Sequence, residues 1–154
     1  MFQDYKDLLS VFNARGVKYL IVGGYAVAVH AQPRGTKDID IFIRADAENA
    51  RLAYAALAEF GAALVGISPE DLADPGKFFR FGYEPRAIDI LPSIDGVAFD
   101  EAWAKRIESV IDKDTGLTAF FVSKEDLIAT KLATGRLQDL ADVQAIKDAE
   151  EGRN

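Results

Sequence analysis

The chain has 154 residues, of which 49% are hydrophobic and 28% are charged, which are ordinary proportions for a soluble globular protein. At this length we expect one domain over residues 1–154, large enough for a proper core but not for a catalytic domain plus a large substrate domain. The formal net charge of −7 argues against non-specific binding to duplex DNA, because that binding depends on neutralising phosphates with lysine and arginine.

The composition also limits the metal chemistry and the location. The chain has no cysteine and a single histidine, which excludes disulfides, cysteine-ligated zinc and multi-histidine sites. Any metal must be held by carboxylates, which points to Mg²⁺ or Mn²⁺. We find neither a secretory leader nor an apolar run long enough to cross a bilayer. We therefore expect no membrane association and a cytoplasmic location.

The apolar spacing and the glycine and proline positions predict alternating helices and strands. The expected fold class is α/β (α+β), with a mixed β-sheet flanked by helices. In chain order, we expect a helix over 3–15, strand 17–22, short helix 25–31, strand 37–44, helix 46–60, an irregular segment over 62–76, strands 77–83 and 86–91, short helix 99–105, a hairpin of 106–111 and 117–122, and helices 123–134 and 137–150.

Two aspartates one residue apart lie on the strand expected over 37–44. Strand side chains alternate between the two faces of a sheet, so Asp38 and Asp40 point the same way. Two carboxylates on one face repel each other unless a cation lies between them, and hard divalent cations prefer oxygen ligands. The neighbouring isoleucines make the strand too apolar for a solvated edge. We therefore predict that Asp38 and Asp40 bind Mg²⁺ or Mn²⁺.

A double glycine, Gly23-Gly24, follows the apolar run 19–22 and precedes a helical segment. Glycine lets the backbone approach a phosphate without a side chain in the way, and a helix N-terminus favours anions. Basic residues follow at Arg34, Lys37 and Arg44. A lone glycine pair is also compatible with an ordinary tight turn. Beside a metal-binding pair, however, it favours phosphoryl or nucleotidyl transfer.

The order of these motifs resembles the DNA polymerase beta-like nucleotidyltransferase superfamily. Its signature is a Gly-Gly or Gly-Ser pair, a helix, an Asp-x-Asp or Asp-x-Glu strand, and a third carboxylate on a later strand. The pattern Gly23-Gly24-x-Ala26, His30, Pro33-Arg34-x-Thr36-x-Asp38-Ile39-Asp40 is similar to a small bacterial branch that includes nucleotidyltransferase toxins of the AbiEii type. The segment from Lys131 to Asp142 also matches that branch, so the resemblance covers residues 17 to 146.

The resemblance implies a nucleotidyltransferase palm-like fold and a third metal ligand at Asp89, between Ile88 and Ile90. A charge on so apolar a strand is also costly unless it is paired or metal-bound. The resemblance further implies that Lys131 contacts the triphosphate, whereas the pattern alone would predict a lysine whose stem covers apolar surface. Arg34 and Thr36 are expected to contact the nucleotide; the alternatives are a solvated turn residue and an ordinary strand residue.

Other polar residues have roles that the pattern leaves open. His30 is expected to pack or to form a hydrogen bond rather than to act as a catalytic base. Arg136, Asp139 and Asp142 are equally compatible with a structural ion-pair cluster and with a place in the active site. Asp95 is a weaker competitor for the third carboxylate.

We expect a metal-dependent nucleotidyltransferase that moves a nucleoside monophosphate from a nucleoside triphosphate to a hydroxyl on tRNA, a protein or a small molecule. The toxin resemblance implies an antitoxin partner. One rival is an adenylyltransferase acting on an antibiotic, but such enzymes usually add a helical acceptor-binding domain, for which this chain has no room. The other rival is a silent nucleotide-binding or antitoxin-like module, which the three intact aspartates disfavour.

Overall fold

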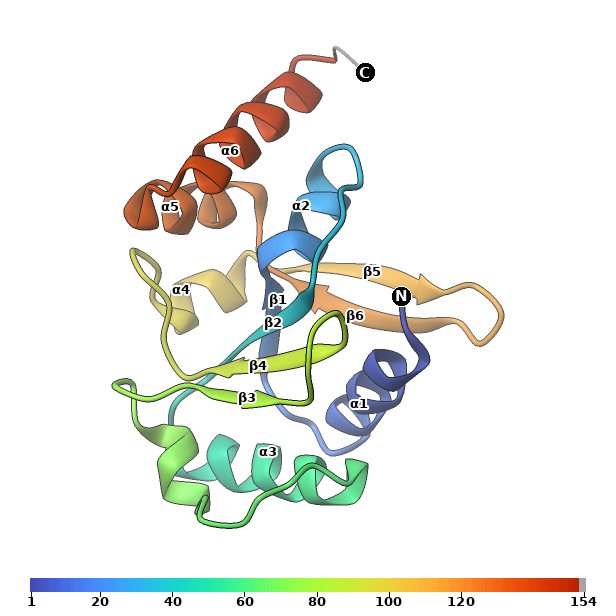
Figure 1. Ribbon diagram of the computed structural model, residues 1–154, viewed down its shortest axis with the longest axis vertical. Helices are drawn as coiled ribbons and strands as arrows, with labels where there is room; N and C mark the ends of the chain where they lie inside the picture. Colours follow the sequence, from blue (N-terminus) through green and yellow to red (C-terminus); the bar gives the residue numbers. More distant parts are fainter. Residues whose placement is uncertain (153–154) are drawn as a thin grey trace.

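The computed structural model describes residues 1–152, and that part of the chain folds around a six-stranded mixed sheet (Figure 1). The strands lie side by side in the order β3-β4-β2-β1-β6-β5. β2 runs parallel to β4 and β1 parallel to β6, whereas the other neighbours are antiparallel. The bounds are β1 (Tyr19–Val22), β2 (Asp38–Ile43), β3 (Phe79–Phe81), β4 (Ala87–Leu91), β5 (Ile107–Asp112) and β6 (Leu117–Phe121).

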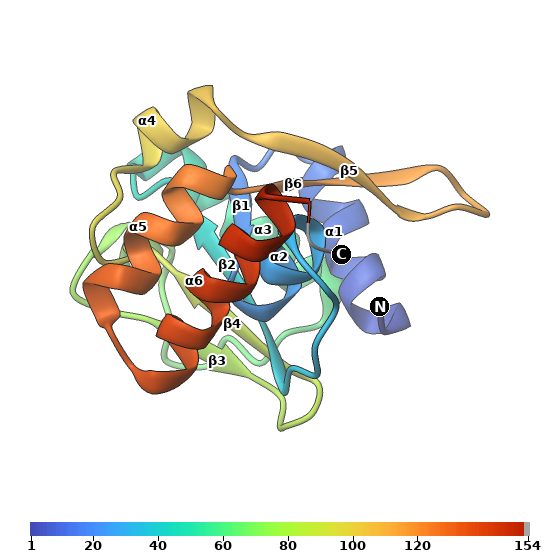
Figure 2. The same ribbon diagram turned by 90° about the horizontal axis from the view of Figure 1, so that it is seen from above.

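The helices form two groups around the sheet. α1 and α3 contact each other, while α2 contacts both α5 and α6. Figures 1 and 2 show α2, α5 and α6 gathered together, and Figure 1 shows α3 at the opposite end of the molecule. The bounds are α1 (Gln3–Ala14), α2 (Gly23–His30), α3 (Ala47–Phe60), the short 3₁₀ helix η1 (Pro69–Ala73), α4 (Phe99–Ala104), α5 (Lys124–Thr134) and α6 (Leu137–Glu150).

The central strand β2 has one face that is apolar throughout and one face that is acidic at its start and apolar at its end. Ile39, Ile41 and Ile43 are fully buried in the core. The other face carries Asp38 and Asp40 and then Phe42, whose ring packs edge-on against Phe99 of α4 at 5.0 Å between centroids. Burial of the apolar residues on both sides fixes the strand. The two carboxylates are thereby held at one end of a rigid element.

Helix boundaries follow local signals that the sequence already contains. The Asp46 side chain accepts a hydrogen bond from the Asn49 amide at 2.9 Å at the start of α3. Ser123 accepts one from the Asp126 amide at 3.2 Å at the start of α5. Gly61 and Gly135 end these helices in the left-handed conformation, with φ of 99° and 65°. These are the usual polar N-cap and glycine C-cap.

The fold class agrees with the expectation, and the differences are local. α2 begins at Gly23, two residues earlier than expected, so both glycines belong to its first turn. β3 covers only Phe79–Phe81, and the strand is followed by Gly82, whose φ is 77°. The segment 62–76 includes η1, whose start carries a capping box between Ser68 and Asp71. These differences arise from glycine conformation and capping rather than from the hydrophobic pattern.

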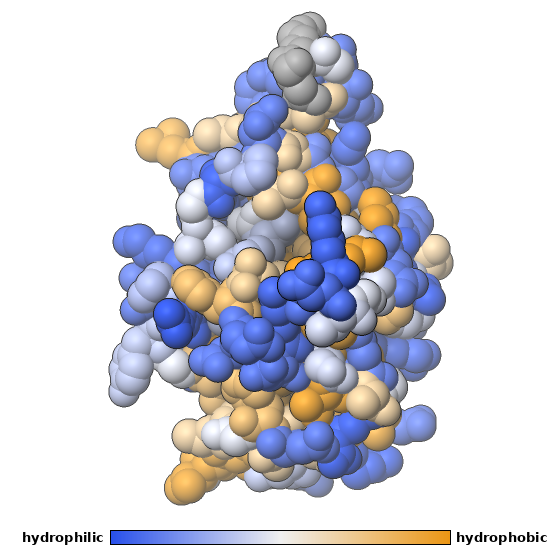
Figure 3. All heavy atoms as spheres, turned by 90° about the vertical axis from the view of Figure 1, so that its right-hand side faces the viewer, coloured by the Kyte–Doolittle hydropathy of each residue, from blue (hydrophilic) through white to orange (hydrophobic). Residues whose placement is uncertain are grey.

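The face toward which the β5–β6 hairpin points shows hydrophilic side chains with scattered hydrophobic ones (Figure 3). Single exposed apolar side chains such as Val65 and Val110 are normal for a folded protein. No helix within residues 1–152 is long and apolar enough to cross a membrane.

Candidate active site

Strand register assembles a row of charged side chains across the sheet. Asp40 of β2 pairs with Asp89 of β4, and Asp89 pairs in turn with Arg80 of β3. On the other side of β2, Asp40 lies opposite Val22, the last residue of β1. Directly paired residues place their side chains on the same face of a sheet. Asp38, two residues before Asp40, shares that face.

The three aspartates form a compact carboxylate trio. One oxygen from each of Asp38, Asp40 and Asp89 lies within 4.8 Å of the others. Burial, followed by the charges of Asp38 and Asp89, raises the pKa of Asp40 to about 7. Burial and the charge of Asp89 also raise the pKa of Asp38. Carboxylates this close disfavour joint ionisation unless a cation balances them.

Arg80 contacts the trio and was not singled out by sequence reasoning. Its Nε and Nη2 donate to both oxygens of Asp89 at 2.8 and 2.9 Å, and Nη2 also donates to Asp38 at 3.1 Å. The hydrogen bonds to Asp89, and then the negative charge of Asp89, raise the pKa of Arg80. A signal existed in the sequence: Arg80 alternates with Phe79 and Phe81 on a strand next to the one that carries Asp89. This alternation points to Asp89 only once the register is known that places Arg80 opposite Asp89.

Gly23 and Gly24 let the first turn of α2 approach the trio. Gly23 has φ of 69°, and a Cβ on it would overlap the carboxylate of Asp40. A Cβ on Gly24 would lie only 2.8 Å from the Cβ and Oγ1 of Thr36 and 3.3 Å from Nη1 of Arg34. No side chain of the described residues caps the N-terminus of α2. The glycines therefore allow the close packing of this site. The backbone amides at the start of α2 have no capping side chain among the described residues and remain available to a ligand.

Lys131 lies in an ion-pair cluster formed by α5, α6 and the segment after α2. Its ammonium is 2.9 Å from Asp142 and 3.6 Å from Asp139, and its side chain is only 7% exposed. It is neither a surface lysine nor an unpaired phosphate ligand. We call Arg34, Lys131, Arg136, Asp139 and Asp142 the α5–α6 cluster.

The arginines complete the α5–α6 cluster. Arg34 donates from Nε and Nη2 to the two oxygens of Asp142, both at 2.9 Å. Arg136 donates from Nε to Asp139 at 2.8 Å. Burial would raise the pKa of Asp139, but hydrogen bonds from Arg136 and Thr134 hold it at about 2. Of the two readings left open for Arg136, Asp139 and Asp142, the ion-pair cluster is present. Four of its members line a cavity that Asp38 and Asp40 also line: Arg34, Lys131, Arg136 and Asp139.

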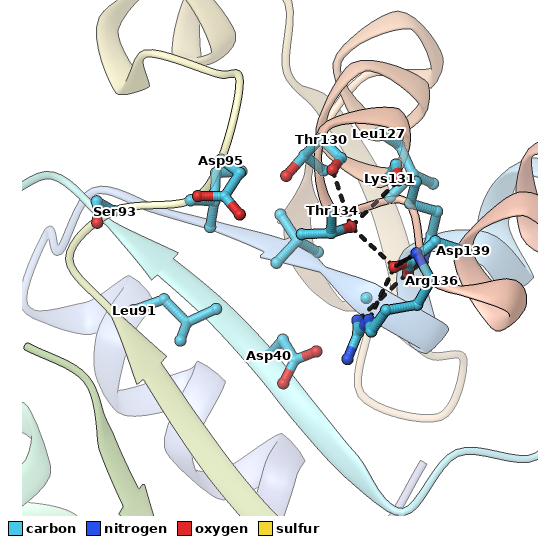
Figure 4. Close-up of a pocket in the computed structure, with 13 residues that line it drawn as sticks. Asp40, Leu91, Ser93, Asp95, Leu127, Thr130, Lys131, Thr134, Arg136 and Asp139 are labelled. Carbon is cyan, nitrogen blue, oxygen red and sulfur yellow. Dashed lines mark hydrogen bonds and ion pairs between the residues drawn. The ribbon is translucent and has the colours of Figure 1, made fainter.

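Two cavities open over these residues and share Gly23, Asp40, Lys131, Arg136 and Asp139 as lining. The larger, of about 490 Å³, is otherwise lined by glycine and polar residues that include Gly24, Arg34, Thr36 and Asp38. The smaller, of about 240 Å³, adds apolar Leu91, Ile94 and Leu127 and hydroxyls from Ser93, Thr130 and Thr134. Figure 4 shows Asp40 on a strand and Thr130 and Thr134 on the helix opposite. The two cavities thus differ in polarity and meet at Asp40.

The remaining candidate residues have identifiable contacts. Thr36 donates from Oγ1 to the backbone carbonyl of Asp38 at 3.1 Å, which supports the start of β2. The His30 ring nitrogen Nε2 forms a hydrogen bond with the Val122 carbonyl at 2.9 Å, in line with the structural role expected for it. Asp95 lines the smaller cavity and is not part of the trio. Lys37 is 77% exposed and lies 3.9 Å from Glu84.

The sequence over residues 1–147 matches the family described as a nucleotidyltransferase of unknown function (DUF6036). The chain belongs to this nucleotidyltransferase family. No curated protein matches the sequence. Among solved structures, the nucleotidyltransferase is similar to the lincosamide antibiotic adenylyltransferase LnuA in its lincomycin-bound crystal structure, with a TM-score of 0.61, 18% identity and 96% of each chain covered. At that identity, the likeness shows the fold alone.

The LnuA structure bears on one argument made from the sequence. We argued that adenylyltransferases acting on antibiotics usually add a helical acceptor-binding domain, for which this chain has no room. The LnuA chain in that crystal structure is covered to 96% by this chain, so the two chains are similar in length. The family match and the structural neighbour support a nucleotidyltransferase without singling out the AbiEii-type branch, so that branch stays a prediction.

The trio of this nucleotidyltransferase fits a divalent cation. It supplies three hard oxygen ligands that lie within 4.8 Å of one another, the donor type that Mg²⁺ and Mn²⁺ prefer. Mutual repulsion and burial, which raise the pKa of Asp40 and Asp38, would be relieved by a bound cation. Arg80 already shows that two of the carboxylates attract positive charge.

Proposed function

We propose that this nucleotidyltransferase moves a nucleoside monophosphate from a nucleoside triphosphate to a hydroxyl acceptor and releases pyrophosphate. The observation that carries the proposal is a polar cavity that is lined by two carboxylates of the trio, Asp38 and Asp40, and by the first turn of α2. A metal-binding group and an anion-binding helix start on one cavity are the two parts that phosphoryl-group transfer requires.

Asp38, Asp40 and Asp89 would hold Mg²⁺ or Mn²⁺. A divalent cation there supplies Lewis-acid polarisation of the phosphoryl oxygens and charge neutralisation. In the transfer itself, the acceptor oxygen bonds to the α-phosphorus, the bond from that phosphorus to the pyrophosphate oxygen breaks, and the acceptor hydroxyl gives up its proton to solvent water. The aspartates hold the reacting groups in place, and no covalent nucleophile of the chain takes part.

The two cavities suggest which part of the substrate binds in each. The triphosphate belongs in the larger cavity, where the backbone of Gly23 and Gly24 starts α2 without a capping side chain. Arg34, Thr36 and Lys131 line the same cavity and would contact phosphate oxygens. Since Arg34 and Lys131 are already paired with Asp142, they would act as charges held in position. The smaller, partly apolar cavity suits an organic group of a substrate.

The acceptor is a hydroxyl on tRNA, a protein or a small molecule. The AbiEii-type resemblance favours tRNA or protein as the acceptor and implies an antitoxin partner. The likeness to LnuA favours a small molecule as the acceptor. A nucleoside triphosphate substrate and a chain without cysteine favour the cytoplasm. We also propose that residues 1–154 act as one domain.

The test is to incubate the purified protein with each α-labelled nucleoside triphosphate, Mg²⁺, and separately total tRNA, cell protein or a set of hydroxylated small molecules that includes lincomycin. Label transfer should occur in one arm and be lost in Asp38→Asn/Asp40→Asn. Mass analysis of the labelled product identifies the acceptor. Tight Mn²⁺ binding with no transfer in any arm would favour a silent nucleotide-binding module and overturn the proposed function.

A further inference from the structure

The guanidinium of Arg80 lies where the trio needs positive charge. Three of its hydrogen bonds join it to Asp89 and Asp38 at 2.8 to 3.1 Å. Both oxygens of Asp89 accept from it, in the paired geometry that makes arginine–carboxylate contacts strong. Among residues 1–152, Asp40 has no ion pair with a basic side chain. Arg80 therefore pairs with two of the three carboxylates, Asp38 and Asp89, and not with Asp40.

A divalent cation needs the same oxygens. Binding at Asp38, Asp40 and Asp89 would bring a double positive charge next to the Arg80 guanidinium, which is itself permanently charged. Arg80 must then either leave the carboxylates or remain and repel the cation. Both outcomes lower the affinity of the trio for the metal, so the sign of the effect does not depend on which one occurs.

Arg80 has room to move. Its side chain is 43% exposed, while that of Asp89 is only 10% exposed. β3 is the edge strand of the sheet and has three residues. Glu84, on the turn that follows β3, lies 3.9 Å from Nη1 of Arg80. The guanidinium can therefore exchange Asp89 for another partner without disturbing the buried strands β2 and β4.

We propose that Arg80 is a built-in counter-ion that competes with the divalent cation for Asp38 and Asp89 and so sets the metal affinity of the free enzyme. This inference rests on the proposed function, because it takes the trio as the metal site. It makes Arg80 a positioning residue: it keeps the repelling carboxylates together before the cation binds, and it gives way when the cation arrives.

The experiment compares Mn²⁺ binding by calorimetry in the wild type and in Arg80→Met, which keeps the length of the stem but removes the charge. Exposed ion pairs are weak, so we expect only roughly two- to fivefold tighter Mn²⁺ binding in Arg80→Met. In EDTA the same variant should melt at a lower temperature than the wild type, and added Mn²⁺ should raise its Tm by more.

Two further variants separate this effect from general electrostatics and from misfolding. Arg80→Lys keeps a point charge without the paired geometry and should bind Mn²⁺ with intermediate affinity. Arg86→Met is the matched control, because Arg86 is exposed, stacks on the ring of Phe2 at 4.6 Å and makes no ion pair with the trio. Its Mn²⁺ affinity should equal that of the wild type.

The outcomes distinguish the inference from the function on which it rests. Unchanged or weaker Mn²⁺ binding in folded Arg80→Met or Arg80→Lys would overturn the counter-ion role and leave Arg80 as a stabilising contact of an edge strand. Absence of Mn²⁺ binding in every variant and in the wild type would overturn both the counter-ion role and the metal site. Tighter binding in Arg80→Met without nucleotidyl transfer in any acceptor arm would support the counter-ion role while the proposed function failed.

Discussion

Lys131 offers the sharpest test of how the phosphate side of the site is built, because it connects stability with binding. Its ammonium lies 2.9 Å from Asp142 and 3.6 Å from Asp139 and is almost fully buried. Removing one partner of a buried ion pair costs about 3–5 kcal/mol. Here Arg34 still donates to both oxygens of Asp142, and Arg136 still donates to Asp139. Because these partners keep the two carboxylates paired, we expect Lys131→Met to lose less than that range, about 2–3 kcal/mol of unfolding free energy.

The assay is urea unfolding followed by nucleotide titration in Mg²⁺. Most domains have 5–15 kcal/mol of stability, so Lys131→Met should remain folded and measurable. Loss of one charge-assisted hydrogen bond to phosphate costs about 1.5–3 kcal/mol, which corresponds to nucleotide binding weaker by roughly ten- to hundredfold. Lys131→Arg should recover only part of that loss, because the guanidinium is larger and planar.

Asp142→Asn separates the two effects. It removes the charge that neutralises Lys131 but keeps the ammonium, so it should lower stability while nucleotide affinity is kept or increased. If Lys131 has only a structural role, Lys131→Met and Asp142→Asn will both lower stability and leave nucleotide affinity unchanged. That result would refute the assignment of Lys131 to the triphosphate.

Three further predictions address the trio and the glycines. The pKa of Asp40 is raised to about 7, so the folded state binds a proton between pH 4 and 7 that the unfolded state does not, and metal-free stability falls as pH rises through this window. Asp40→Asn should therefore stabilise the metal-free protein at pH 8 and hardly at all at pH 4 in thermal unfolding. An equal gain at both pH values would contradict proton binding by Asp40 as the cause. Asp38→Asn/Asp40→Asn should abolish Mn²⁺ binding, and calorimetry that shows unchanged affinity would remove the trio as the metal site. Gly24→Val should weaken triphosphate binding and also lower thermal stability, since its Cβ would meet Thr36 at 2.8 Å, whereas a variant with unaltered nucleotide affinity would exclude the α2 backbone from binding.

Local patterns predicted the elements that form the floor of the site. Alternation along residues 37–44 placed Asp38 and Asp40 on one face, because strand side chains have a period of two whatever the rest of the fold does. The apolar neighbours of Asp89, Ile88 and Ile90, likewise indicated a buried strand from local sequence alone. The caps at Asp46, Ser123, Gly61 and Gly135 are likewise local, which is why the bounds of α3 and α5 agree closely with the expected ones.

Features that depend on strand register and on packing between distant segments could not be predicted from the local sequence pattern. Arg80 meets Asp89 because β3 and β4 pair antiparallel with those two residues opposite, and nothing near Arg80 in the sequence indicates that register. Gly24 looked like an open phosphate cradle, but the space beside it is filled by Thr36 and Arg34. The partners of Lys131 lie 8 and 11 residues further along on another helix, and their roles depend on how α6 turns back over α5.

The distribution of charge around the two cavities explains how an acidic chain can build a site for a polyanion. Lys131, Arg34 and Arg136 are each paired with Asp139 or Asp142, and Arg80 is paired with Asp89 and Asp38. Because these cations are already paired, they attract a free phosphate less than bare lysines would, which disfavours indiscriminate binding of nucleic acid. In the proposed function, a triphosphate that arrives with its divalent cation would balance both sides at once, because the cation would meet the trio while the phosphates would meet the start of α2. Selectivity for a metal-bound nucleotide would then follow from charges that are paired in advance rather than from an excess of positive charge.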